Sequence, residues 1–440
     1  MNATLALAER RVPRYTSYPT APHFSAAVGA QTYVSWLGAL PPASTLSLYL
    51  HVPYCVELCL YCGCTTKAVR RYAPVEAYAV HLKNEIGLLD AALGTRRVVH
   101  LHWGGGTPSI LGADRLIDLV DRLAATFDLG AVAEHAIELD PRRVTPELAA
   151  ALGRIGITRA SFGVQDFSAH VQQAIGRIQP FDQVAEAIDA VRAAGIANIN
   201  VDLMYGLPRQ TVGDVIRSAE LAASLAPARL ALFGYAHVPW LKPHQKLIDE
   251  AALPSAAERI AQLHAATETL EECGYGRIGL DHFAALGDDM ARAARTGRLH
   301  RNFQGYTTDM ADALIGLGAS AIGQLPQGYV QNAQDVASYA RMIESGQFAT
   351  VRGRSLSADD RVRGRIIERL MCDLAVDLDI DDAQFSAELR EIDALGASGI
   401  VRRNGGRIIV TEAGRPFARL VAAAFDAYLP RTGGRHSVAV

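Results

Sequence analysis

From residue 46 onward, short apolar runs alternate with longer segments in which apolar residues recur three and four positions apart. The apolar runs have strand length, and they predict β-strands at 46–52, 98–103, 135–140, 159–164, 197–204 and 229–236. The longer segments predict amphipathic helices, for example at 75–93 and at 181–194, where the pattern stops at Gly195. Strand and helix in regular alternation predict a parallel sheet that is covered by helices.

Six strand–helix units indicate an α/β protein. The arrangement is either a doubly wound sheet or an incomplete (β/α)6 barrel related to the TIM barrel. In both folds, the functional groups gather at the C-terminal ends of the parallel strands. We therefore expect the functional residues of this chain directly after the predicted strands.

The chain outside this core divides into three parts by composition. Residues 1–45 form a polar arm, interrupted by prolines and without strong periodicity, which we expect to cover the active site. Residues 246–354 mix helical segments with glycine-rich loops, and they predict a barrel extension that supplies substrate-site loops. The expected domains are therefore 1–45, 46–245, 246–354 and 355–440.

Residues 355–440 predict a mostly helical C-terminal cap domain. Helices are expected at 361–371, 385–400 and 417–429, and a hairpin at 401–411 with its turn at Asn404 and Gly405. Helices followed by a basic hairpin resemble a winged helix, a fold often used to bind DNA. The other interpretation is a helical cap or docking domain, and the absence of a net positive charge favours it.

The composition is that of a globular enzyme. Half of the 440 residues are hydrophobic and 20% are charged, with a net charge of -3 and a pI of about 6.5. A domain that wraps nucleic acid is usually basic. The sequence shows neither a leader pattern nor an apolar run of the roughly 18 residues that a membrane span needs. We therefore expect a cytoplasmic protein without a nucleic-acid or membrane partner.

Four of the six cysteines stand within ten positions, directly after the first predicted strand: Cys55, Cys59, Cys62 and Cys64. A disulfide, a zinc site and an iron–sulfur cluster are the three interpretations. Disulfides seldom persist in the cytosol, and a chain this long has no need of one. Zinc takes four ligands, and no second pair of cysteines or histidines with the usual spacing follows. The histidines that could complete a zinc site are His51, His100 and His102.

The C-x3-C-x2-C spacing favours a [4Fe–4S] cluster. Such a cluster is normally held by four cysteine thiolates. Three thiolates would leave one iron open, and an open iron can bind a substrate or a cofactor directly. Cys64 is separated from Cys62 by a single residue, which leaves little room for both to be ligands. We therefore expect Cys64 to have another role.

A polar or small residue lies at or near the C-terminal end of nearly every predicted strand. These residues are Gly104, Gly105, Gly106 and Thr107 after the second strand, then Glu138, Gln165, Asp202 and Ala236. Glycines let the backbone approach a ligand where a Cβ would clash. A phosphate loop is a weak interpretation, because no Gly-Lys-Ser/Thr follows the glycines. Glu138 alone could be a helix cap, but the whole set predicts an active site at the mouth of a barrel.

The three-cysteine loop, with Tyr61 directly before its last cysteine, resembles the signature of the radical S-adenosylmethionine (SAM) enzymes. The GGGTP segment is a familiar companion of that loop. Over nearly its whole length, the chain further resembles one family of these enzymes, the oxygen-independent coproporphyrinogen III oxidases (dehydrogenases). The resemblance rests on PRYTSYPTA at 13–21, on YCGCTT at 61–66, and on GLDHFA and LHRNFQGYTT between 279 and 308. It implies a partial barrel of the radical SAM type.

The resemblance implies one [4Fe–4S] cluster and two SAM molecules. Cys55, Cys59 and Cys62 would hold the cluster, and the first SAM would bind the open iron. The residues expected around the first SAM are Tyr49, Gly105, Glu138, Ala236 and Ile322. Those expected around the second SAM are Tyr61, Gly106, Thr107, Gln165, Arg177 and Asp202. The residue types suit these roles, since Asp202 can accept from ribose hydroxyls and Arg177 can grip a carboxylate.

The resemblance also implies the reaction. Two propionate side chains of a tetrapyrrole, coproporphyrinogen III, would lose CO2 and become vinyls, giving protoporphyrinogen IX in haem biosynthesis without O2. An unactivated C–H bond offers no handle for acid or base catalysis, so a protein assigns such a step to a cofactor. An external electron donor and an external acceptor are implied, and we expect a monomer.

The catalytic candidates near the substrate are Cys64, Phe303, Gln304 and His51. Packing alone could explain Phe303, and a thiol buried as a small hydrophobe could explain Cys64. Propionates need cations, and the candidates within the motif segments are Arg14, His300 and Arg301. Two alternatives stay open at this point. One is a haem-chaperone-like paralogue without this turnover, and the other is a zinc-containing module that binds nucleic acid or protein.

Overall fold

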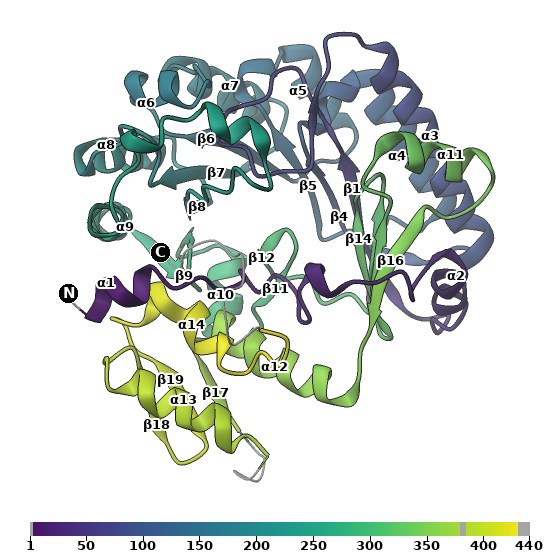
Figure 1. Ribbon diagram of the computed structural model, residues 1–440. Helices are drawn as coiled ribbons and strands as arrows, with labels where there is room; N and C mark the ends of the chain where they lie inside the picture. The colour runs from purple at the N-terminus through teal and green to yellow at the C-terminus, as the bar shows by residue number, and fades with distance from the viewer. Residues whose placement is uncertain (1–2, 379–383, 430–440) are drawn as a thin grey trace.

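A parallel sheet forms the centre of the protein (Figure 1). The structure is a computed structural model that describes residues 3–378 and 384–429. Its central strands are β1 (Thr45–Val52), β4 (Arg97–Gly105), β5 (Glu134–Leu139), β6 (Arg159–Gln165), β7 (Asn198–Tyr205) and β8 (Arg229–Gly234). They pair in this order, and every pair is parallel. The α/β class and the six predicted strands are confirmed.

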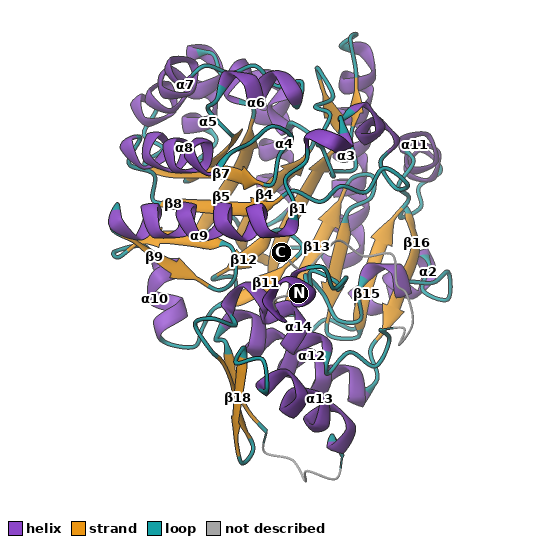
Figure 2. Cartoon of the chain, turned by 60° about the vertical axis from the view of Figure 1, so that its left-hand side comes forward, coloured by secondary structure: helices purple, strands orange, loops and turns teal. Residues whose placement is uncertain are grey.

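Helices connect these strands and cover one side of the sheet (Figure 2). They are α3 (Ala73–Leu93), α4 (Gly112–Thr126), α5 (Pro146–Arg154), α6 (Ala169–Ala174), α7 (Phe181–Ala193) and α8 (Val212–Ser224). The helices α3, α4, α5 and α7 pack against one another in chain order. The two helices that the sequence predicts at 75–93 and 181–194 match α3 and α7. Within the described residues, no helix is long and apolar enough to cross a membrane.

Side chains along β1 point alternately to the hydrophobic core and to the candidate site. Leu46, Leu48 and Leu50 are fully buried members of the main hydrophobic core. Tyr49 and His51 point to the other face, where their side chains hydrogen-bond to each other. Because successive strand residues face opposite sides of a sheet, one strand both packs against the helices and presents polar groups to the interior.

The sheet continues beyond the six predicted strands on both sides. Next to β1 lie the parallel β13 (Ala313–Leu317) and an antiparallel meander of β14 (Ile322–Leu325), β15 (Gly328–Asn332) and β16 (Thr350–Ser355). Next to β8 lie β10 (His282–Ala285) and β9 (Tyr275–Ile278). Among the described residues the sheet has twelve strands. The sequence pattern indicated helices and glycine-rich loops at 246–354 but did not show these strands, because they are short and several contain glycine.

The other elements of the extension are helices and a small ribbon. They are α9 (Ala256–Glu272), α10 (Asp289–Arg295), α11 (Val336–Glu344), and the ribbon of β11 (His300–Asn302) and β12 (Gly305–Thr307). A capping box of Ser255 and Glu258 begins α9, since each side chain satisfies a backbone N–H of the other residue. Short 3-10 helices lie at Ala21–His23, Pro108–Leu111, Pro141–Arg143, Pro243–Leu247, Glu250–Ala252 and Arg415–Phe417.

The N-terminal arm is partly helical, which the sequence pattern did not predict. It contains α1 (Ala3–Ala8) and α2 (Ala30–Gly38), and α2 packs against α3 and β16. The stretch of the arm that joins α1 to α2 runs between the sheet and the C-terminal domain (Figure 1). Tyr15 donates to Asp426 Oδ2 at 3.0 Å, and the backbone N–H of Ala427 donates to the Tyr18 hydroxyl at 3.0 Å. The C-terminal domain therefore holds the arm in place.

The C-terminal domain consists of α12 (Ala358–Cys372), β17 (Ala375–Asp377), α13 (Ser386–Gly396), β18 (Val401–Asn404), β19 (Arg407–Val410) and α14 (Ala418–Ala423). Its three strands form a small sheet in the order β17-β19-β18 beside the helices, as in a winged helix. The hairpin turn lies at Gly405 and Gly406, one residue later than predicted. The last helix is shorter than the predicted 417–429, and residues 430–440 lie outside the described part of the chain.

A buried carboxylate ties α3 to the strands beside β1. Glu85 accepts hydrogen bonds from the Gly318 backbone N–H at 2.6 Å, Asn332 Nδ2 at 2.7 Å and the Tyr339 hydroxyl at 2.8 Å. Burial raises the pKa of Glu85 to about 7, although these three donors favour its charged form. The glutamate therefore changes charge near neutral pH while it holds the loop after β13.

We expect Glu85→Gln to gain stability relative to the wild type as the pH rises. An acid with a raised folded-state pKa stabilises the fold below its unfolded pKa, and this contribution is lost as the pH rises through the folded value near 7. Between about pH 5 and about pH 8, the difference in free energy of unfolding should shift by about 2 kcal/mol toward the variant. Urea unfolding measures it, with the exposed Glu186→Gln as the control. If the wild type and Glu85→Gln have parallel pH curves, Glu85 does not titrate in this range.

Candidate active site

The cysteine loop leaves the C-terminal end of β1 and is closed by a short strand pair. β2 (Tyr54–Cys55) pairs with β3 (Lys67–Ala68), so residues 56–66 form the loop between them. Within the loop, the backbone N–H of Cys62 donates to the carbonyl oxygen of Cys59 at 3.2 Å. This turn keeps the three predicted cluster ligands on one short segment at the end of a sheet strand.

A second segment, residues 236–248, holds the cysteine loop from outside. Lys242 Nζ, His244 Nε2 and Gln245 Nε2 lie 2.7, 2.8 and 2.9 Å from three carbonyl oxygens of the loop. Those carbonyls belong to Cys64, Cys62 and Tyr61. Polar backbone groups that have partners keep a loop in one conformation. No sequence pattern marked these three side chains as part of the site.

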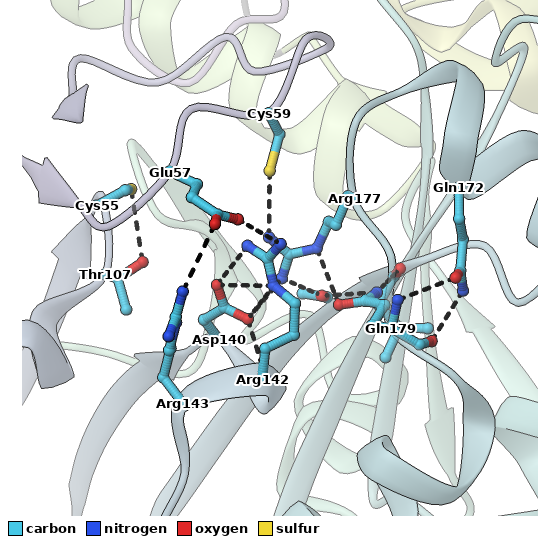
Figure 3. Close-up of polar contacts among 12 residues, drawn as sticks. Cys55, Glu57, Cys59, Thr107, Asp140, Arg142, Arg143, Gln172, Arg177 and Gln179 are labelled. Atoms are coloured by element: carbon cyan, nitrogen blue, oxygen red, sulfur yellow. Dashed lines mark hydrogen bonds and ion pairs between the residues drawn. The ribbon is translucent and has the colours of Figure 1, made fainter.

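Each of the three predicted ligand sulfurs has a hydrogen-bond donor. The donors are Thr107 Oγ1 at 3.5 Å from Cys55 Sγ, Arg177 Nη1 at 3.4 Å from Cys59 Sγ, and the Cys64 backbone N–H at 3.4 Å from Cys62 Sγ. Figure 3 shows the first two. Donors to sulfur favour the thiolate, which is the form that binds a metal.

Cys62 and Cys64 share a proton-dependent contact. A hydrogen bond from the Cys64 side chain lowers the pKa of Cys62 to about 7, against the effect of burial. The same hydrogen bond raises the pKa of Cys64 well above its usual value, although this residue is exposed. Cys62 is therefore the thiolate of the pair and Cys64 the thiol. The absence of Cys64 from the ligand set and its catalytic role both stay predictions.

An ion network lies behind Cys59 (Figure 3). The Arg177 side chain is 9% exposed, and its Nη2 lies 3.4 Å from Asp140 Oδ1. Arg177 also donates to Gln179 Oε1 at 2.9 Å. Its guanidinium therefore joins a predicted cluster ligand to a buried carboxylate at the end of β5. The sequence predicts Arg177 as a SAM residue, but it does not show that Asp140 and Gln179 hold it.

The same carboxylate reaches the cysteine loop through a second arginine. Asp140 binds the Arg142 guanidinium with both oxygens, at distances from 2.7 to 3.2 Å. Arg142 in turn lies 3.3 Å from Glu57 in the loop. Burial alone would raise the pKa of Asp140, but the hydrogen bonds and charges of Arg142 and Arg177 outweigh it and hold that pKa below its usual value.

Tyr49, His51 and Glu138 gather where β1, β4 and β5 end. The Tyr49 hydroxyl lies 3.0 Å from His51 Nδ1, and the Gly105 backbone N–H donates to Glu138 Oε2 at 3.1 Å. Burial lowers the pKa of His51 and raises that of Tyr49, so both side chains are neutral at physiological pH. The structure therefore brings together three of the five residues predicted for the first SAM, namely Tyr49, Gly105 and Glu138.

The glycines after β4 allow close packing at this point. A Cβ on Gly104 would lie 2.8 Å from Glu138 Oε1, and a Cβ on Gly105 would lie 2.7 Å from the His51 ring. Gly105 also has a φ of +114°, which other residues rarely adopt. A Cβ on Gly106 would meet the cysteine loop itself. The sequence predicted room for a ligand here, and the structure uses that room for site side chains and the loop.

Four other predicted SAM residues lie on or just after further strands. Asp202 accepts from Asn200 Nδ2 at 2.8 Å and from Ser161 Oγ at 3.3 Å, and burial raises its pKa to about 6. Gln165 ends β6 at a bulge, with a φ of +72°. Ala236 follows β8 by two residues, and Ile322 begins β14. These positions agree with a site at the C-terminal edge of the parallel strands.

Phe303 and Gln304 form the turn of the β11–β12 ribbon. Phe303 packs edge-to-face on Tyr329, with ring centroids 6.1 Å apart, and the Gln304 backbone N–H binds Asn302 Oδ1 at 2.9 Å. These contacts attach the turn to β15 and to the ribbon itself, and none of them reaches the cysteine loop. Their catalytic role therefore stays a prediction.

The three predicted cations line two cavities, and Arg301 belongs to both. Arg14 and Arg301 line the same cavity together with Asp281. His300 instead lies 2.9 Å from Glu368 of α12.

The donor set suits an iron–sulfur cluster and SAM. Three free thiols stand on one loop with a donor to each sulfur, and carboxylates that can accept from amino or hydroxyl groups stand at the neighbouring strand ends. Within residues 3–378 and 384–429, no three His, Cys, Asp or Glu side chains are arranged around a single metal ion. The second ring nitrogen of His51 lies 3.0 Å from the Thr65 carbonyl oxygen, so both nitrogens have partners. His51 is thus engaged elsewhere and is not placed to complete a zinc site.

Known proteins resemble this chain along its whole length. Residues 49–222 match the Radical SAM superfamily. The chain is 47% identical to the oxygen-independent coproporphyrinogen III oxidase of Bradyrhizobium diazoefficiens, over 100% of both chains. It is 43% identical to the protein of the same name from Paracoccus denitrificans, over 99% of this chain and 98% of that one. Its fold is similar to that of the coproporphyrinogen III oxidase HemN from Escherichia coli, which is described as a radical SAM enzyme. The two structures superpose with a TM-score of 0.90 and are 36% identical in sequence. The match covers 96% of this chain and 100% of that chain.

Proposed function

The chain belongs to the family of oxygen-independent coproporphyrinogen III oxidases, and on this premise we propose that it converts coproporphyrinogen III into protoporphyrinogen IX without O2. Two propionate side chains become vinyl groups. In this conversion each propionate, as its carboxylate, loses one CO2, one proton and two electrons. The substrate is thus a tetrapyrrole, and the enzyme is a radical SAM oxidoreductase of haem biosynthesis. Family membership sets aside the zinc-containing binding module considered from the sequence.

One observation carries the proposal within the molecule. The three cysteines of the loop each have a hydrogen-bond donor on sulfur, and the loop ends beside the polar side chains at the mouths of β1, β5 and β7. A reactive centre and its binding groups on one edge of a parallel sheet is the arrangement that α/β enzymes use. No general acid and base pair is needed at such a site, because the chemistry belongs to the cofactor.

The cofactors follow from the family and the donor set. We propose that Cys55, Cys59 and Cys62 hold one [4Fe–4S] cluster and that two SAM molecules bind beside it. The first would contact Tyr49, Gly105, Glu138, Ala236 and Ile322, and the second Tyr61, Gly106, Thr107, Gln165, Arg177 and Asp202. When bound, the cluster and SAM supply one electron and a 5′-deoxyadenosyl radical that can take hydrogen from an unactivated C–H bond.

The side chains of the site position these groups and keep them out of water. Arg177 places a buried positive charge beside Cys59 and within reach of a SAM carboxylate. Asp202 lies among hydrogen-bond donors and can turn its oxygens to ribose hydroxyls. Cys64 is a free thiol next to the proposed cluster ligands, and we propose that it acts there without binding iron. We assign Phe303, Gln304 and His51 to the substrate side of the site.

The surrounding parts act as covers. We propose a partial barrel at 46–245, an extension at 246–354, and an arm and a C-terminal domain that close the mouth of the barrel. The arm reaches the end of β8, where Arg14 Nη2 donates to the Gly234 carbonyl oxygen at 3.2 Å. We further propose a cytoplasmic monomer that takes electrons from an external donor, passes electrons to an external acceptor, and binds neither nucleic acid nor membrane.

Anaerobic turnover tests the function. Reconstituted protein is incubated with SAM, a reductant, an electron acceptor and coproporphyrinogen III, and protoporphyrin (after oxidation) and 5′-deoxyadenosine are quantified. We expect both products, with one 5′-deoxyadenosine for each propionate that is lost. If 5′-deoxyadenosine forms without protoporphyrin, the proposed substrate is wrong. If iron-replete protein forms neither product but binds haem, the chain is a haem-chaperone-like paralogue.

A further inference from the structure

Two arginines from the two most distant motifs meet at one cavity. Arg14 lies in the arm segment PRYTSYPTA, and Arg301 lies in β11 of the segment LHRNFQGYTT. Both line a cavity of about 40 Å3 that also has Gly234 and Ala236, at the end of β8, in its wall. The proposed function gives these arginines no role, although two chain segments far apart in sequence are needed to bring them together.

Arg301 presents unsatisfied donors in a fixed position. Its side chain is 5% exposed, and its Nε and Nη1 are buried without a hydrogen-bond partner. Its guanidinium lies 4.4 Å from the centroid of the Tyr306 ring, and Nη1 lies 3.8 Å from Asp281 Oδ1, beyond hydrogen-bond distance. A buried guanidinium whose N–H donors lack partners is unfavourable unless a ligand accepts hydrogen bonds from them.

Arg14 faces the same space from the arm. One of its nitrogens is held by the Gly234 carbonyl oxygen at 3.2 Å. Its side chain lines the cavity and is exposed to solvent. Ala236, one of the residues proposed for the first SAM, lines the same cavity. Arg14 therefore looks into a recess near the proposed reaction centre.

The cavity has an excess of positive charge. Its charged residues are Arg14, Arg259, Asp281, Arg301 and Arg419, and its tyrosines are Tyr205 and Tyr235. Arg259 and Arg419 take part in other interactions as well. Asp281 is the single carboxylate of this wall, and His282 Nδ1 already lies 2.8 Å from one of its oxygens. Such a wall attracts an anion, and planar guanidinium groups suit a carboxylate best.

We propose that Arg14 and Arg301 form a carboxylate-binding subsite that anchors one propionate of the porphyrinogen. The inference rests on the proposed function, which supplies a substrate with four propionates. On a scale where one water needs roughly 10–15 Å3, this cavity of about 40 Å3 has room for a few waters, so it admits a carboxylate group. Arg301 also lines a second cavity of about 440 Å3 between the arm, the β11–β12 ribbon and α12, which leaves room for more of the substrate.

The anchored propionate is one that the product keeps. A carboxylate gripped by two guanidiniums is stabilised as the anion. When CO2 leaves, the negative charge is lost from between the two guanidiniums. The same contacts would therefore raise the barrier to decarboxylation of a propionate bound there. The subsite therefore fixes the orientation of the ring and selects, by exclusion, which two propionates reach the reaction centre.

Binding of coproporphyrin III, the stable oxidised form of the substrate, tests the subsite. Quenching of porphyrin fluorescence gives the Kd for the tetra-acid and for its tetramethyl ester. For Arg14→Gln and Arg301→Gln we expect the Kd of the tetra-acid to rise about tenfold or more, with the Kd of the ester unchanged. Arg301→Lys should fall between, since lysine keeps the charge but not the planar fork. The exposed Arg154→Gln on α5 is the control and should bind as the wild type does.

The outcomes of this experiment distinguish failure of the proposed subsite from failure of the proposed function. If all variants bind the tetra-acid as tightly as the wild type does, the subsite is wrong, even where turnover proceeds. If binding depends on both arginines but no protoporphyrinogen forms, the proposed function fails and the subsite stands. Should Arg301→Gln fail to fold, the more accessible Arg14→Gln decides the matter. The control Arg154→Gln should form 5′-deoxyadenosine without substrate as the wild type does.

Discussion

Replacing any one of Cys55, Cys59 and Cys62 by serine is expected to remove the cluster and to abolish protoporphyrinogen formation. Bound iron should fall from about four per chain to below about one, and turnover should fall more than about a thousandfold. Serine is almost isosteric with cysteine, but its hydroxyl does not ionise near neutral pH and is a poor ligand for iron. Iron and sulfide content, together with the absorption spectrum of anaerobically reconstituted protein, measure the first effect. The anaerobic turnover assay measures the second.

Two further cysteines provide matched controls. Cys273→Ser replaces an exposed thiol that follows α9 and should leave iron content and turnover unchanged. Cys64→Ser should keep the iron, because Cys64 is the protonated partner of Cys62, but should slow turnover. If Cys64→Ser loses iron as completely as Cys62→Ser does, Cys64 is a ligand and the three-cysteine assignment is wrong. If Cys62→Ser keeps both iron and turnover, the proposed cluster site itself is wrong.

The central sheet could be predicted because its signals are local. Each of its six strands is an apolar run bounded by helical periodicity, and the residues at the strand ends follow at once from that assignment. Glu138 and Asp202 stand where the sequence places them, since the C-terminal ends of neighbouring parallel strands meet at one edge. For these elements the sequence within one strand–helix unit contains enough information.

The elements that were missed depend on partners far along the chain. The run at 313–317 has five residues and contains a glycine, so its pattern is no stronger than that of a loop. It becomes a strand by pairing with β1, about 270 residues away, where Leu48 lies opposite Ile315. Arg177 was predicted as a SAM residue from the family resemblance, yet the carboxylate that holds it directly follows β5. Pair contacts of this kind carry no signal in a single sequence.

The second large effect concerns the ion network behind Cys59. We expect Asp140→Ala to lower the free energy of unfolding by about 3–5 kcal/mol, as removal of one partner from a buried ion pair generally does. Asp140 is the carboxylate between two guanidiniums, and the side chains of Asp140, Arg142 and Arg177 are 9%, 11% and 9% exposed. Without it, Arg142 and Arg177 remain buried near each other with less compensating charge. Urea unfolding of the apo-protein at neutral pH measures the loss.

Asp140→Asn separates charge from hydrogen bonding. The amide keeps an oxygen that can accept from Arg142 but loses the negative charge, so the loss should be smaller than for alanine. The pH dependence of the free energy of unfolding gives a second test of the role of Asp140. Because Asp140 has a lowered pKa in the folded state, its contribution is present above the unfolded value near 3.9 and is lost as the pH falls below it. The stability gap between the wild type and Asp140→Ala should therefore narrow in acid.

An exposed ion pair shows whether burial is the cause. Asp118 lies 2.6 Å from Lys83 Nζ, but these side chains are 43% and 44% exposed. Asp118→Ala should lower the free energy of unfolding by less than about 1 kcal/mol, since solvent screens such pairs. Asp140→Ala should also slow cluster loading, because Arg177 loses the carboxylate that helps to direct it at Cys59. If Asp140→Ala and Asp118→Ala lower stability equally, and iron loading is unchanged, the network does not hold the loop. The cysteines would then depend on Lys242, His244 and Gln245, whose three contacts hold the loop from the other side.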